Sequence, residues 1–284
     1  MPLNTMNVQS DVIRRNLEQM RTVVAEFLQA IPAARWTHPT EKHGWTTHQT
    51  LAHLVAAGEG LNDIIAQHRA GQSTHIPGLA QRSDLPTWNE RHTDELTVIP
   101  PDGLIERLLK VYSQAMDYVP VAHDDRLIPM PMYNRGGTVA EVLGWQCCHV
   151  GLVHAAQLAN GAGIAPMWER YDPAFMRWMI TQFLDQMSHS YRVERGQTLT
   201  ACINLIVGGQ HGGQWHLTID PAGGSSGEGL TARPNMTLRL PNARAFCNLF
   251  TLQYHPAYAL LTGKVFVTGN LRLALRLNYL FNPT

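Results

Sequence analysis

Residues 145–158 have the sequence WQCCHVGLVHAAQL, an apolar stretch that carries two histidines, His149 and His154. We expect the stretch to lie in a helix that runs to about residue 160, because Thr138 and Glu141 form a capping-box pattern at its start. Histidines that share a metal ion from one helix are normally three or four residues apart. Here the spacing is five, which on a regular α-helix turns the two rings about 140° apart.

One surplus residue in a helix can be absorbed by a π-bulge, and such bulges favour functional sites. Gly151 lies between the two histidines and weakens the helix locally, which favours a distortion at this place. With a bulge, His149 and His154 can both turn toward a third ligand. On an unbroken α-helix, only one of them can.

The third candidate ligand, His53, lies in residues 45–54, which have the sequence WTTHQTLAHL. We expect a helix that begins near residue 46, on which His53 shares a small apolar face with Ala57, Gly60 and Ile64. Its ring should therefore point into protein, where a neutral imidazole needs a partner for each nitrogen. His53 is either a hydrogen-bonded core residue or a metal ligand.

Apolar residues at spacings of three and four predict further helices in the first half of the chain. The expected helices span residues 10–31, 46–69, 103–119 and 138–160. Residues 72–101 are polar and contain prolines, so we expect a lid or a wrapped surface loop there. Four helices with two long connections predict a four-helix bundle as a first domain, residues 1–165.

In the second half of the chain, residues 166–284, the spacing of apolar residues changes from a helical pattern to one typical of strands. After a helix at 172–192, strand patterns dominate. We expect strands at 199–207, 214–220, 236–240 and 264–268, glycine-rich turns at 208–213 and 223–229, and a final helix at 270–281. The pattern predicts an α+β domain, an antiparallel sheet with helices on one face, so the whole chain is multidomain, α and α+β.

Composition limits the function classes. Lys plus Arg and Asp plus Glu both number 22, so the neutral total argues against a surface for nucleic acid or an anionic membrane. No run approaches the length of a membrane span, and residues 1–10 carry no apolar signal core. The four cysteines form no CxxC pair, which favours reduced thiols. We expect a soluble, cytoplasmic protein.

The segments at 45–54 and 149–158 resemble the DinB-like family of four-helix metal-binding proteins. That resemblance implies that one histidine of the second helix and two ligands of the fourth bind a divalent metal, which carries over to His53 and His154. The remaining ligand of the family, usually four residues before the last histidine, falls on Val150. His149 stands one position away, so either a bulge restores it as a ligand or the site is degraded.

The last part of the chain resembles the sterol carrier protein type-2 fold. The order of features carries this resemblance: a helix, WHLTID at 215–220, TLRL at 237–240, and GKVFVTGN at 263–270 before a terminal helix. Members of that fold bind apolar ligands in a tunnel. A DinB-like bundle followed by such a domain is the order found in thiol-dependent maleylpyruvate isomerases.

We therefore expect a metal-dependent enzyme that uses a low-molecular-weight thiol, as an isomerase or transferase acting on a small electrophilic substrate. His53, His149 and His154 would hold the ion, with zinc as the first candidate and nickel or iron as alternatives. Gln157 would orient one imidazole. The sequence singles out no catalytic side chain.

The alternative is a non-catalytic protein that binds a lipid or another apolar ligand and keeps a vestigial metal site. Candidate lining residues for that ligand are Phe246, Phe250, Tyr254, Tyr258, Leu260 and Phe266. A homodimer is compatible with bundle helices that have apolar second faces. The discriminating feature is whether the three histidines meet.

Overall fold

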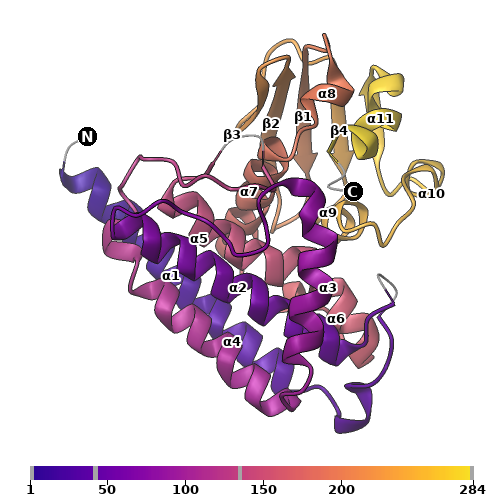
Figure 1. The fold of residues 1–284 in the computed structure, drawn as a ribbon. Coiled ribbons are helices and arrows are strands. Elements are labelled where there is room, and N and C mark those ends of the chain that lie inside the picture. Colours follow the sequence, from indigo (N-terminus) through magenta and orange to yellow (C-terminus); the bar gives the residue numbers. More distant parts are fainter. Residues whose placement is uncertain (1–2, 41–43, 134–135, 282–284) are drawn as a thin grey trace. The chain divides into compact units, whose positions relative to one another are not determined.

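The structure is a computed structural model that describes residues 3–40, 44–133 and 136–281 (Figure 1). It divides into two compact units. The first takes in most of the chain up to Arg170, and the second runs from Tyr171 onward and includes Met132 and Tyr133.

The first unit is helical. Its helices are α1 (Leu3–Gln29), α2 (Thr47–Arg69), α3 (Leu85–Leu96), α4 (Pro101–Met116), α5 (Val139–Cys148) and α6 (Ala155–Ala162), with a π-helical turn at His149–Val153 between the last two. Helix α4 packs against α1 and α2, while α5 contacts α1 and α2 and α6 contacts α2. The segment from α5 to α6 therefore acts as one rod, and the predicted four-helix bundle is present.

One buried face holds each rod in the bundle. On α1, the predicted apolar stripe is inside, with Leu17, Met20, Val24 and Phe27 fully buried. Burying one such side chain contributes about 1.5–3 kcal/mol relative to leaving it in water. Within the described ranges, no helix combines the length and the apolar character needed to cross a membrane.

The prediction of a lid or wrapped loop at 72–101 is wrong over its second half, where the chain forms α3 and packs on α2. Pro86 occupies the first turn of α3, where its missing N–H has no helical partner to lose. Trp88 is buried, its indole N–H donates to the carbonyl of Pro77 at 3.1 Å, and its ring lies against Gly60 of α2. This tryptophan therefore anchors the segment to the bundle.

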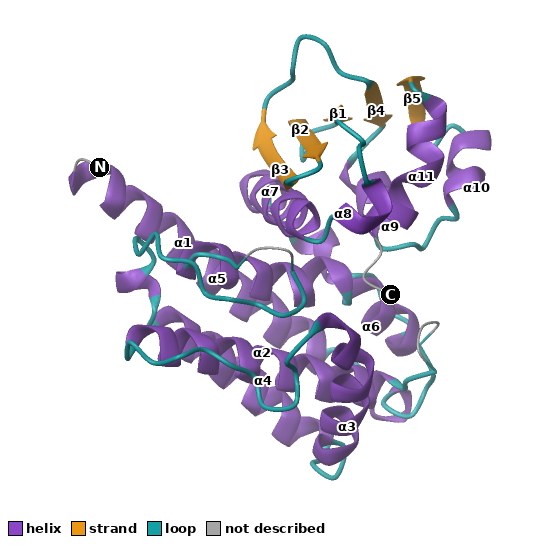
Figure 2. Cartoon of the chain, turned by 45° about the horizontal axis from the view of Figure 1, so that its top comes forward, coloured by secondary structure: helices purple, strands orange, loops and turns teal. Residues whose placement is uncertain are grey.

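The second unit is a five-stranded sheet with helices. Its elements are α7 (Pro173–His189), α8 (Val193–Gly196), β1 (Ala201–Val207), β2 (Gly213–Asp220), β3 (Gly223–Glu228), β4 (Met236–Leu240), α9 (Ala243–Phe250), α10 (Pro256–Leu261), β5 (Phe266–Gly269) and α11 (Leu271–Phe281). The strand order is β3-β2-β1-β4-β5. Buried and more exposed residues alternate along β2 and β4, and the helices gather on one side of the sheet (Figure 2).

The sheet is mixed, so the expectation of a purely antiparallel sheet is wrong for one pair of strands: β4 runs parallel to β1. The chain leaves β3 at one edge, passes β2 and β1 through residues 229–235, and enters β4 in the direction of β1. The Asn204 side chain on β1 holds this crossover, because it donates to the carbonyl of Thr231 and accepts from the N–H of Thr231, each at 3.0 Å. Hairpin patterns relate only strands that are neighbours in sequence, so they carried no information on this pair.

The segment expected as a glycine-rich turn at 223–229 is instead mostly the edge strand β3. Its glycines allow close packing on both sides. A Cβ atom on Gly224 would lie 2.5 Å from the carbonyl oxygen of Ser188 in α7, and one on Gly227 would lie 2.7 Å from the His216 ring. Helix α7 packs against this strand, and only residues without side chains permit that approach.

Candidate metal centre

His53 is positioned by the start of α2. The Thr46 side chain accepts from the Gln49 backbone N–H, and the Gln49 side chain accepts from the Thr46 N–H at 2.9 Å, a complete capping box. This fixes where the helix begins and hence which face carries His53, whose ring is buried. The Trp45 ring, just before the helix, lies 5.0 Å from that of His53. Helical periodicity could not predict this contact, because Trp45 lies outside the helix.

The two later histidines are positioned by the π-helical turn. Helix α5 opens with the predicted capping box of Thr138 and Glu141 and ends at Cys148. Over His149–Val153 the chain widens, and the His154 N–H donates to the carbonyl of His149, five residues back, at 3.1 Å. The turn absorbs the surplus residue, which confirms the bulge that the spacing and Gly151 suggested. Val150, at the family's usual ligand position, is buried.

The three rings meet in the bundle. The Nε2 atom of His149 lies 3.0 Å from Nε2 of His154 and 3.4 Å from Nε2 of His53. The ring centroids are 4.6–5.1 Å apart, with all three pairs oriented edge to face. One nitrogen of each ring lies within 4.8 Å of the others, close enough for a single ion. The structure thus brings together the three histidines named from the sequence.

Gln157 contacts this cluster directly. The His154 Nδ1–H donates to Gln157 Oε1, which leaves the lone pair of His154 Nε2 facing the other two rings. Gln157 is itself buried, one turn after His154 on α6. A hydrogen bond on the far nitrogen selects the tautomer and fixes the ring plane, as it commonly does in metal sites.

Burial keeps the central imidazole neutral. Desolvation lowers the pKa of His149 to about 4, so this ring carries no proton charge near pH 7. Metal binding requires the neutral form, and three imidazole nitrogens suit zinc, nickel or iron. The donor set and its protonation therefore fit a divalent ion held by His53, His149 and His154.

The vicinal cysteines do not join this set. Cys147 and Cys148 are both buried, and burial raises the pKa of the Cys147 thiol. A thiol in that state is a poor ligand and a poor nucleophile. Both cysteines are core residues of helix α5.

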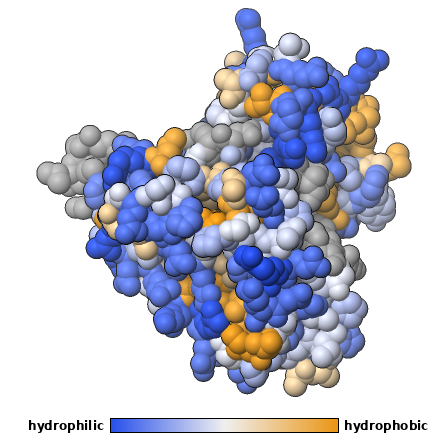
Figure 3. Space-filling view, viewed as in Figure 1, coloured by the Kyte–Doolittle hydropathy of each residue, from blue (hydrophilic) through white to orange (hydrophobic). Residues whose placement is uncertain are grey.

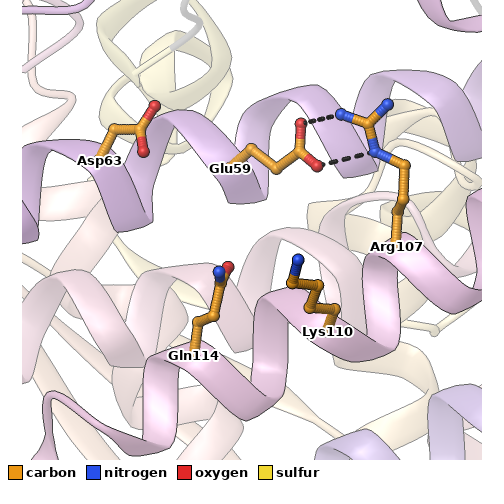
Figure 4. Close-up of a pocket in the computed structure, with 5 residues that line it drawn as sticks. All are labelled: Glu59, Asp63, Arg107, Lys110 and Gln114. Carbon is orange, nitrogen blue, oxygen red and sulfur yellow. Dashed lines mark hydrogen bonds and ion pairs between the residues drawn. The ribbon is translucent and has the colours of Figure 1, made fainter.

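A separate surface cleft of about 570 Å³ lies on α2 and α4 (Figure 4). Its lining residues are Glu59, Asp63, Arg107, Lys110 and Gln114. Arg107 donates to both carboxylate oxygens of Glu59, at 2.9 and 2.7 Å. The cleft is polar, contains none of the three histidines, and is lined by this bidentate ion pair.

Known protein families match both halves of the chain. A family model described as "Mycothiol maleylpyruvate isomerase N-terminal domain" matches residues 17–159, and one described as "SCP-2 sterol transfer family" matches residues 180–282. No curated protein matches the sequence.

Solved structures of mycothiol-dependent maleylpyruvate isomerases share the fold at low sequence identity. A mycothiol-dependent maleylpyruvate isomerase matches at 11% identity and a TM-score of 0.54, covering 84% of this chain and 87% of that one. A histidine-to-alanine mutant of a mycothiol-dependent maleylpyruvate isomerase matches at 10% identity, with the same TM-score of 0.54 and coverages of 84% and 87%. Apo sterol carrier protein 2 of Yarrowia lipolytica matches at 20% identity and a TM-score of 0.26, covering 35% of this chain and 80% of that one. The first family model spans half of the chain, which belongs to the mycothiol maleylpyruvate isomerase N-terminal domain family and carries an SCP-2-type domain after it.

Proposed function

We propose that this chain is a metal-dependent enzyme that uses a low-molecular-weight thiol to isomerise, or transfer a group to, a small electrophilic substrate. The observation that carries the proposal is the convergence of three Nε2 atoms from two rods of the bundle, made possible by the π-helical turn. Family membership supports the same reading. Mycothiol and maleylpyruvate, which name the family, are the first thiol and substrate to test.

The residues of this chain have distinct tasks in the proposal. His53, His149 and His154 hold the ion, for which zinc is the first candidate and nickel and iron are the alternatives. Gln157 fixes the ring of His154, and burial keeps His149 unprotonated. A divalent ion bound by three protein ligands keeps a position open and lowers the pKa of a thiol that binds there, which supplies a nucleophile at neutral pH.

A carboxylate substrate would need a cationic partner. Three arginines are candidates on sequence grounds: Arg135, Arg233 and Arg239. Arg135 lies outside the described residues, while Arg233 and Arg239 are exposed in the second unit. We further propose residues 1–165 as the metal-binding domain and 166–284 as the sterol-carrier-type domain.

The test is an isomerisation assay with maleylpyruvate, with and without mycothiol, on protein stripped of metal and then reloaded. We expect turnover only when metal and thiol are both present, and a fall to the background rate in His154→Ala. The matched control is His75→Ala, an exposed histidine of the same unit, which should keep full activity. Turnover that needs no thiol, or that survives complete metal removal, would contradict the proposal.

A second candidate is a carrier of an apolar ligand, favoured by the SCP-2 match over residues 180–282. The phenyl rings of Phe183, Phe246 and Phe250 form an apolar cluster, with centroids 4.6–5.8 Å apart. Among the expected lining residues, Phe246 is buried, but Tyr258 and Phe266 are exposed. Native mass spectrometry of the purified protein would reveal a bound lipid, and failure to bind a fluorescent fatty acid would count against this function.

A further inference from the structure

The neutral total charge conceals an uneven distribution. From residue 229 to the C-terminus the sequence contains no aspartate or glutamate. The cationic residues in the same stretch are Arg233, Arg239, Arg244, Lys264, Arg272 and Arg276. Three of these cations, Lys264, Arg272 and Arg276, lie on α11 or in the turn before β5, so this segment of the chain carries positive charge and no carboxylate of its own.

Large apolar side chains are exposed on the same elements. Leu261 at the end of α10 is 86% exposed, Phe266 on β5 is 57% exposed, and Leu275 and Tyr279 on α11 are 64% and 55% exposed. Apolar surface gathers over α10 and α11 in the space-filling view (Figure 3). We call these two helices, together with β5, the C-terminal face.

The contacts of helix α11 with the rest of the unit fix which of its residues face outward. Its inner residues Leu273, Leu280 and Phe281 are buried. The Arg192 N–H donates to the carbonyl of Leu280 at 2.8 Å, and the Arg195 guanidinium donates to the carbonyl of Tyr279 at 2.9 Å. The helix therefore cannot rotate to hide its outer residues without breaking these contacts.

The outer residues of α11 have a distinctive order. Leu271, Leu275 and Tyr279 recur every four residues and form one stripe, with Arg272 and Arg276 beside it, all exposed. Helices that lie in a lipid interface have this composition, with bulky apolar residues beside arginines whose stems can extend toward headgroups. The turn after α10 repeats it, because exposed Lys264 stands between Leu261 and Phe266.

We propose that the C-terminal face docks on the surface of an anionic phospholipid membrane. A second copy of the chain fits less well, because a two-fold contact would set this cationic face against itself. An acidic protein would match the charge, but it would need a complementary pocket for each protruding side chain. A lipid surface accepts scattered apolar side chains and supplies negative charge everywhere, so it matches both features.

The test is co-sedimentation of the full chain with vesicles of phosphatidylglycerol mixed with phosphatidylcholine, against vesicles of phosphatidylcholine alone. We expect binding only to the anionic vesicles, weakening as salt is added. Lys264→Gln with Arg272→Gln should weaken binding roughly 25-fold, at about five-fold per cation. Leu261→Ser with Leu275→Ser should weaken it by roughly ten-fold or more, because exposed leucines no longer enter the interface.

Matched controls come from the first unit. Val98→Ser removes an equally exposed apolar residue, and Arg14→Gln with Arg15→Gln removes two exposed cations. Both controls should bind as the wild type does, and circular dichroism should show all variants folded. The proposal is overturned if the wild type ignores anionic vesicles, binds neutral ones equally well, or keeps its affinity in the C-terminal variants. The wild type could instead fail to bind vesicles and form a dimer. If the double variant Leu261→Ser with Leu275→Ser then lost that dimer, the face would be assigned to self-association.

Discussion

The Nε2 atoms of His149 and His154 lie 3.0 Å apart although five residues separate the two histidines in sequence. The π-helical turn between them makes this approach possible, because it adds one residue without rotating the second ring away from the first. The geometry of the candidate site thus depends on a local distortion of a single helix.

Deleting Val150 tests this dependence. The deletion shortens the spacing of the two histidines to four, at which a regular α-helix places both rings on one face. We therefore expect the variant to bind metal as the wild type does, with an unbroken helix in its crystal structure. Elemental analysis gives the metal content, and thermal unfolding checks that the protein is folded.

The matched change is insertion of one alanine after Val150, which increases the spacing to six. On a helix this turns the rings apart, so metal content should fall to the background. If the deletion loses metal as the insertion does, the π-helical turn contributes more to the site than the correction of spacing.

Gln157 should affect metal affinity without being a ligand. Gln157→Ala removes the acceptor for His154 Nδ1–H, and affinity should fall by about 10- to 100-fold. Gln157→Glu keeps an acceptor in place and should retain affinity at or above the wild-type value. Competition with a chromophoric chelator measures both variants. Equal losses in the two variants would mean that packing, rather than the hydrogen bond, is what Gln157 provides.

The sequence predicted the helices of the bundle, because apolar spacing records which face of a helix is buried, and it named the three histidines as candidate ligands. His53 and His154 followed from that spacing together with the family resemblance. The sequence did not decide whether His149 joins them, because a five-residue spacing is compatible with a bulge or with rings facing apart. Packing of the whole rod against α1 and α2 decides between these, and a local pattern does not contain that information.

The second unit shows where local patterns fail. The strands were recognised from their alternation, but the pairing of β4 with β1 depends on a crossover held by Asn204 and Thr231. The glycine-rich sequence at 223–229 predicts a turn, whereas in strand β3 the close approach of Ser188 requires a glycine at position 224. Likewise, a neutral charge total says nothing about where the charges lie along the chain.

Two glycines should respond in opposite ways to alanine. A Cβ atom on Gly161 of α6 would overlap Thr47 Oγ1 and lie 3.0 Å from Thr40 Cγ2, so Gly161→Ala should cost about 1–3 kcal/mol of unfolding free energy. At Gly60 of α2 the nearest atoms lie at 3.9 Å, so Gly60→Ala should stabilise by about 0.5–1 kcal/mol through better helix propensity. Urea unfolding measures both. Tolerance of Gly161→Ala would show that α6 and α2 pack less closely than described.

Asp124 gives a pH dependence away from the histidine cluster. Its hydrogen bonds with Arg126 hold the pKa of this carboxyl well below its ordinary value of 3.8, and it lies 3.3 Å from the ring of His68 on α2. The unfolded chain therefore takes up the proton first as pH falls, so the stabilisation is present above about pH 4 and is lost below it. Asp124→Asn should cost about 1 kcal/mol at pH 7, and the difference from wild type should shrink below pH 4. Urea titrations at several pH values measure this, and a difference that stays constant with pH would contradict it.

The most direct measurement is the metal content of the chain purified without a histidine tag or added metal. We predict about one equivalent of a divalent transition metal in the wild type, because a buried three-ligand site retains its ion through purification. His53→Ala and His154→Ala should each lose it, while His75→Ala should not. A folded wild-type protein with less than about a tenth of an equivalent, and no uptake when zinc, nickel or iron is supplied, would contradict the account.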